Sequence, residues 1–120
     1  MLKIKAKIFC ISILILCSLS IFSQNLPKVE KVEPQNWWAN HTINPVRLLV
    51  RGENLQKANV TNKNRDLAIG ATRTTKNGKY LFVSVLINKA KPGKYSFDVT
   101  TPNGKTSIPF EVSAPLDEQT

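Results

Sequence analysis

The sequence predicts an all-β protein, an immunoglobulin-like sandwich of the E-set type in which about seven antiparallel strands form two sheets. Short segments with alternating apolar and polar residues recur along the chain after residue 24. Turn dipeptides such as Asn77-Gly78 and Asn103-Gly104 separate them, and this part of the chain has no apolar helical period. Strands at this spacing, without helices, are typical of a two-sheet sandwich around one core.

Seven strands follow from the alternation. They are predicted at residues 28–33, 46–51, 58–61, 67–74, 80–87, 94–100 and around 108–112. In three of them we expect one apolar face in the core, formed by Val46, Leu48, Val50, Tyr95, Phe97, Val99, Ile108, Phe110 and Val112. Residues 52–54 are predicted to turn the chain. Pro109 has no N–H to donate, which places the last strand at a sheet edge or on a bulge.

Residues 1–23 have the pattern of a secretory signal peptide. Three lysines open the segment, residues 8–22 form an uncharged and mostly apolar run, and Ser23 is a small residue before a polar sequence. The run is shorter than the roughly 20 residues of a membrane-spanning helix. We therefore expect cleavage after Ser23 and export to the periplasm or the cell surface. A retained membrane anchor and a lipoprotein attached at Cys17 are the alternatives.

The mature chain is predicted to be one domain, residues 24–115, with a polar tail at 116–120. Both cysteines, Cys10 and Cys17, lie in the signal segment, so the mature chain has no disulfide and no thiol chemistry. Removal of the three signal lysines leaves 14 basic and 8 acidic residues, a net charge of +6. The basic residues are scattered singly without interleaved aromatic residues, which favours a solvated surface over nucleic-acid or membrane binding.

The residue inventory excludes most enzymatic sites. His41 is the only histidine, and neither a Gly-x-Ser-x-Gly motif nor a phosphate-binding glycine loop is present. Glycoside hydrolysis needs two carboxylates held about 5–10 Å apart, whereas the acidic residues here are scattered singly over predicted strand faces, turns and the tail. We therefore expect no catalytic residue, no metal site and no cofactor, and we expect His41 to be an exposed loop side chain.

The most unusual segment is residues 33–38, which end in two adjacent tryptophans. Successive side chains of an extended segment point in opposite directions, so we expect one tryptophan in the core and the other outside. Two interpretations stay open. Either the pair anchors the first strand over the end of the sandwich, or Trp37 or Trp38, together with Asn36, contacts a sugar ring or a neighbouring domain.

The strand at residues 80–87 is apolar on both faces. One face is aliphatic throughout, and the other keeps Tyr80, Phe82 and Leu86, interrupted only by Ser84. A sandwich strand with one solvent-facing side normally alternates apolar and polar residues, and soluble monomers rarely expose large apolar patches. We therefore predict a docking face, covered by the tryptophans or a loop, by a partner chain, or by a second domain.

Four segments of the chain resemble the N-terminal domain of bacterial cyclomaltodextrinases and neopullulanases, glycoside hydrolases of the α-amylase family. The segments are residues 29–38, 48–54, 80–83 and 90–95, and Pro-x-Asn-Trp-Trp is the most specific part. The sequence departs from the family in two places. Ala39-Asn40-His41 replaces a glycine-containing turn, and the chain stops at Thr120, where the barrel would begin.

The resemblance implies an immunoglobulin-like sandwich that precedes a catalytic (β/α) barrel and does not carry the catalytic carboxylates. The implied function is a non-catalytic accessory domain of a maltodextrin- or cyclodextrin-degrading enzyme, truncated or split from its barrel. The barrel or a second copy of the chain would be its protein partner, and maltooligosaccharides its ligands. The alternative is a free-standing secreted immunoglobulin-like module that binds a protein or a carbohydrate.

Overall fold

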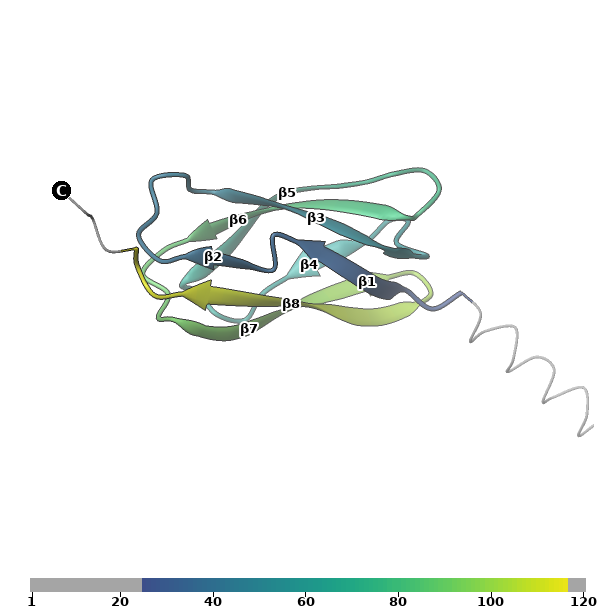
Figure 1. Ribbon diagram of the computed structural model, residues 1–120. Helices are drawn as coiled ribbons and strands as arrows, with labels where there is room; N and C mark the ends of the chain where they lie inside the picture. The colour runs from purple at the N-terminus through teal and green to yellow at the C-terminus, as the bar shows by residue number, and fades with distance from the viewer. Residues whose placement is uncertain (1–24, 117–120) are drawn as a thin grey trace, which may run out of the picture.

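A computed structural model describes residues 25–116, which form a two-layer β-sandwich (Figure 1). The predicted all-β, immunoglobulin-like class is confirmed. The strands are β1 (Lys28–Glu33), β2 (Asn36–Trp38), β3 (Val46–Glu53), β4 (Asn59–Thr61), β5 (Leu67–Thr74), β6 (Tyr80–Ile87), β7 (Gly93–Thr101) and β8 (Gly104–Ser113). The predicted signal peptide and all but Leu116 of the predicted tail lie outside the described residues. Within that range, no helix has the length and apolar character to span a membrane.

The two sheets have the strand orders β1-β3-β6-β5 and β2-β8-β7-β4. Neighbouring strands are antiparallel, as predicted, with one exception: β2 runs parallel to β8. The chain therefore changes sheets between β1 and β2, where Figure 1 shows a short connection crossing from one layer to the other. The order matches the arrangement of an immunoglobulin-like sandwich with a divided first strand.

The core lies between the sheets and comes from every second residue of the long strands. Eight of the nine predicted core residues are buried; Tyr95 is half-buried. Phe97 and Phe110 stack at the centre, with ring centroids 5.7 Å apart and ring planes inclined by 30°. The alternation of apolar and polar residues in the sequence predicted burial because each long strand has one face against the opposite sheet and one face in solvent.

Tyr95 is only half-buried because its two ends have different roles. The ring packs against the core, while the hydroxyl donates a hydrogen bond of 2.5 Å to the carbonyl oxygen of Lys91, four residues upstream. A tyrosine at the start of this strand, bonded back to the preceding turn, is a recurring feature of immunoglobulin-like sandwiches. The bond fixes how the chain enters β7.

Two predictions about strand ends were wrong in part. Gly52 does not turn the chain but continues β3. The position requires glycine because the backbone of β1 passes close to it: a Cβ at Gly52 would lie 1.9 Å from the carbonyl oxygen of Lys28. Asn54, with a φ of +58°, makes the turn instead. The strand β2 (Asn36–Trp38) is not among the seven predicted strands, because three residues are too few for an alternating pattern to show.

Pro109 lies in a strand that is only partly an edge. β8 sits inside its sheet, between β2 and β7. However, its bonds to the β2 segment begin at Glu111, whose N–H donates to Gln35 at 3.0 Å. The nitrogen of Pro109, two residues before Glu111, faces the same side of β8 as the Glu111 N–H, but β2 does not pair with β8 at that position. The edge prediction is therefore correct for the first half of β8, and its pairing with β7 has no bulge.

Candidate functional site

The two tryptophans of β2 are both half-buried, and their ring centroids are 5.3 Å apart. The expectation of one tryptophan in the core and the other outside was therefore wrong. Trp37 is opposite the buried Val112 and packs against the core. Its indole Nε1 donates a hydrogen bond of 2.9 Å to the carbonyl oxygen of Ile43, so the polar end of the ring is satisfied within the domain. Trp37 therefore fastens β2 and the loop after it to the sandwich.

Trp38 has the outward position, opposite Ser113, and it is half-buried. Its ring stacks on His41 at a centroid distance of 5.5 Å and an interplanar angle of 27°. The Nδ1 of His41 accepts a hydrogen bond of 2.9 Å from the N–H of Ile43, which holds the imidazole in place. The expectation that His41 is exposed was wrong, because the stacking leaves it half-buried.

A hollow of about 410 Å³ opens beside this ring stack. Trp38, His41 and the exposed Leu116 are among the residues around it. Asn36 is on the same outer side of β2 as Trp38, and its Nδ2 donates to the Ser113 hydroxyl at 3.1 Å. The ring centroid of Trp37 lies 4.9 Å from that of His41 and 5.3 Å from that of Trp38. The structure thus brings the two predicted tryptophans together, with Asn36 on the same strand.

The predicted docking face is exposed. Tyr80, Phe82 and Leu86 are 38%, 45% and 41% exposed on the outer side of β6. Within residues 25–116, neither the tryptophan pair nor a loop covers them, so that explanation of the apolar strand was wrong. Leu49, directly opposite Phe82 on β3, is half-buried and extends the apolar surface across the sheet.

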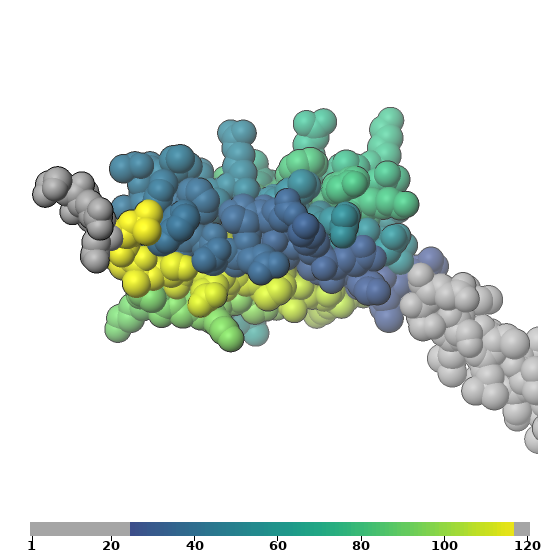
Figure 2. Space-filling view, viewed as in Figure 1, coloured from purple at the N-terminus to yellow at the C-terminus, as the bar shows by residue number. Residues whose placement is uncertain are grey.

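The strand register places three arginines around these apolar side chains, and sequence analysis missed them. Arg51 is opposite Tyr80, Arg73 is opposite Phe82, and Arg47 is opposite Ser84. All three are exposed. In Figure 2, long side chains stand out from the surface on the side where Figure 1 places β3, β5 and β6. Arg47 and Arg51 share β3, whereas Arg73 is on β5, so only the register reveals that Arg73 belongs with the other two.

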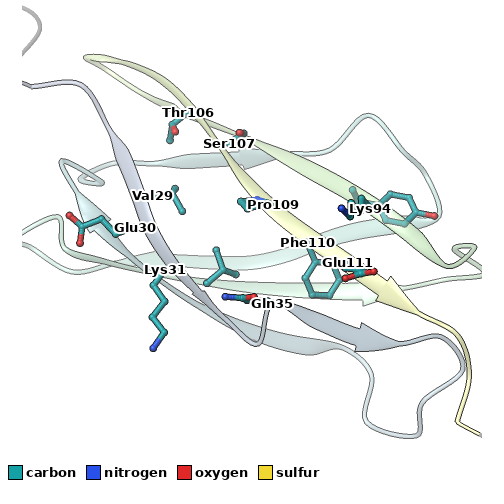
Figure 3. A pocket seen from close by; sticks show the side chains of 12 residues that line it. Val29, Glu30, Lys31, Gln35, Lys94, Thr106, Ser107, Pro109, Phe110 and Glu111 are labelled. Carbon is teal, nitrogen blue, oxygen red and sulfur yellow. The ribbon is translucent and has the colours of Figure 1, made fainter.

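A groove of about 450 Å³ follows the seam between β1 and β8 (Figure 3). It exists because β1 pairs only with β3, while β8 pairs with β2 only from Glu111 onward. Val29 and Pro109 lie between the two strands, whereas the amino group of Lys31 points away from them.

Lys31 forms an ion pair with Glu33 on the same strand, with its Nζ 2.5 Å from the Oε1 of Glu33. The hydrogen bond from Lys31 and its positive charge lower the pKa of the Glu33 carboxyl. The ion pair is exposed to solvent, and Lys31 is among the residues around the groove. No cluster of three or more histidine, cysteine or acidic side chains is placed to hold a metal ion within residues 25–116.

A family model described as "Cyclomaltodextrinase, N-terminal" matches residues 31–114, more than half of the chain. The chain belongs to the cyclomaltodextrinase N-terminal family. This family is the non-catalytic N-terminal part of a glycoside hydrolase, and the described residues 25–116 form the sandwich. The match includes both the tryptophan pair and the face of β3, β6 and β5.

The departure from the family pattern after Trp38 is structurally tolerated. Asn40 has a φ of +58°, a conformation that glycine adopts freely and that asparagine tolerates better than most residues. The turn therefore forms without glycine. It carries His41 back to the rings of Trp37 and Trp38.

Proposed function

We propose that this chain is the accessory domain of a maltodextrin- or cyclodextrin-degrading glycoside hydrolase, and that it docks on the catalytic (β/α) barrel through the outer face of β3, β6 and β5. One observation carries the proposal: Tyr80, Phe82 and Leu86 are exposed together on a strand whose other face is fully in the core. Burial of such an exposed apolar face against another protein surface lowers the free energy, because it removes apolar area from water.

A contribution to substrate binding is the second proposed role, because Trp38 and His41 present stacked rings beside a hollow. Aromatic faces suit the apolar side of a sugar ring, and the Asn36 amide on the same surface suits its hydroxyl groups. We further propose that the signal pattern of residues 1–23 directs the chain to the periplasm or the cell surface.

The docking role is tested with the exported chain and the catalytic barrel of a cyclomaltodextrinase from the same organism. We expect a complex in sedimentation velocity and a change in cyclodextrin hydrolysis when the domain is added. Tyr80→Ser with Phe82→Ser should abolish both. Leu26→Ser is the matched control, because Leu26 is 48% exposed and lies before β1, outside the strands of this face. A chain that forms no complex with the barrel would favour the free-standing binding module.

The sugar role is tested by titrating maltoheptaose and following tryptophan fluorescence. Binding by one ring platform should be weak, with a Kd on the order of millimolar. Trp38→Ala should remove the response, whereas His41→Ala should weaken it. An unchanged spectrum at saturating maltoheptaose would leave the pair with the anchoring role alone.

A further inference from the structure

The outer face of β3, β6 and β5 combines apolar side chains with unbalanced positive charge. We propose that its partner presents at least two carboxylates, one to Arg47 and one to Arg73, around an apolar centre that covers Phe82. This inference rests on the docking proposed above and adds the chemistry of the surface that docks. It identifies the partner surface as acidic and apolar, and not as a sugar or a second copy of this chain.

The two arginines have no ionic partner of their own. Arg73 is directly opposite Phe82 on β5, and Arg47 is opposite Ser84 on β3. Among the described residues, the side-chain ion pairs are Lys31 with Glu33 and Arg51 with Glu30, the latter at 4.0 Å. Arg47 and Arg73 are therefore left to solvent, which makes them available to a partner's carboxylates.

The surrounding strands contain no acid that could neutralise this charge. Neither β5 nor β6 has an aspartate or a glutamate. The acidic residues of this sheet lie on β1 and at the end of β3: Glu30, Glu33 and Glu53. One side of the face is therefore electrically balanced, and the side built from β5, β6 and the start of β3 is positive.

The space between the arginines can admit an incoming side chain. A hollow of about 330 Å³ is lined by Arg47 and Arg73 together with Phe82 and the small residues Ala71 and Ser84. It opens where the β5–β6 register shifts between Ile69 and Thr72. A carboxylate that enters beside Phe82 would be within reach of planar guanidinium groups, which bind carboxylates with two parallel hydrogen bonds.

The charge distribution argues against other occupants. A symmetric dimer whose two-fold axis passes beside Arg47 and Arg73 would bring these arginines of the two copies together without an acid between them. A polyanion such as nucleic acid would have to pass Glu30 and Glu33 on β1. Three side chains that are each about 40% exposed give roughly 200–300 Å² of apolar surface. That area is enough for the centre of a protein interface, whose whole side buries about 800 Å².

The test compares binding of the barrel by the parent chain, by Arg47→Gln, by Arg73→Gln and by the double variant. Each single substitution should weaken binding by about ten- to a hundred-fold, and binding of the parent should fall with added salt more steeply than that of the double variant. Arg65→Gln is the matched control, because Arg65 is also exposed and lies in a turn outside the strands. The Arg65→Gln variant should bind the barrel as tightly as the parent. Parent-like affinity of the double variant would overturn the proposal and leave the docking role standing.

A second measurement separates failure of this inference from failure of the docking role. An acidic peptide with alternating glutamate and phenylalanine is titrated into the isotopically labelled chain. We expect NMR shifts centred on Arg47, Arg73 and Phe82, absent in the double variant, whether or not the barrel binds. Shifts confined to other surfaces would overturn the inference, as would a parent chain that dimerises through this face. Binding of oligothymidine or phosphatidylglycerol vesicles that depends on these two arginines would overturn it as well.

Discussion

Replacement of Phe97 by alanine is the most direct test of how this sandwich is held together. Phe97 is completely buried at the centre of the core, and its ring stacks on Phe110 with centroids 5.7 Å apart. The substitution removes apolar contacts, leaves a cavity between two sheets that are each held by their own ladders, and breaks the aromatic pair. The sheets cannot close the gap without shifting those ladders.

The expected loss is large compared with the stability of the domain. A buried phenylalanine replaced by alanine costs about 3–5 kcal/mol, and loss of the aromatic pair places this site toward the upper end. Domains of roughly 90 residues have a free energy of unfolding of about 5–14 kcal/mol. The corresponding fall in Tm is roughly 12–40 °C. We expect the variant to fold only marginally at 37 °C.

The control is the same chemical change on the other side of the molecule. Phe82 is 45% exposed, and its direct neighbours across the strands are the half-buried Leu49 and the exposed Arg73. Phe82→Ala should therefore cost less than about 2 kcal/mol, because each of two cross-strand pairs contributes about 0.2–1 kcal/mol. Urea unfolding followed by fluorescence, together with calorimetry, measures both variants. Equal losses, or a larger loss for Phe82→Ala, would show that the assignment of inner and outer faces is wrong.

Three further outcomes are expected. Tyr95→Phe keeps the ring but removes the hydroxyl's bond to the preceding turn, and calorimetry should show a loss of about 0.5–1.5 kcal/mol; an unchanged Tm would mean that the bond does not order the turn. Gly52→Ala should destabilise by more than about 1 kcal/mol, because its Cβ would overlap the Lys28 carbonyl; a soluble variant with parent-like urea unfolding would contradict the close approach. NMR titration should give Glu33 a pKa below that of an ordinary glutamate, because Lys31 donates a hydrogen bond to its carboxylate and is positively charged, and Lys31→Met should raise it again. The small stabilisation should be fully present above the pKa of an ordinary glutamate and vanish as the pH falls through the lowered pKa.

Alternating strands were the part of the fold that sequence could predict. Along β6, β7 and β8, every second residue faces the opposite sheet, so a period of two in the sequence translates directly into burial. The exposed trio of Tyr80, Phe82 and Leu86 was predicted in the same way, because it broke the expected alternation. Local pattern and tertiary environment agree in these strands.

Features that depend on two distant segments were not predictable. Gly52 resembles a turn residue, yet its role is set by the carbonyl of Lys28 on another strand. The β2 strand is too short for a pattern to show, and its partner is β8, at the far end of the sequence. The grouping of Arg47 with Arg73 arises from register across three strands. No local property of either arginine indicates it.

The parallel pairing of β2 with β8 also determines how the domain carries mechanical load. β1 begins at one end of the sandwich and β8 finishes at the other (Figure 1). A pull on these two ends therefore draws β2 and β8 in opposite directions along their own axes. Their bonds, bracketed by Glu111 to Gln35 and by Ala39 to Ser113, would be strained together instead of opening one after another. We expect force spectroscopy to find a higher unfolding force when the sandwich is pulled at these two ends than when it is pulled through β7. A module of this design therefore transmits tension from one of its ends to the other.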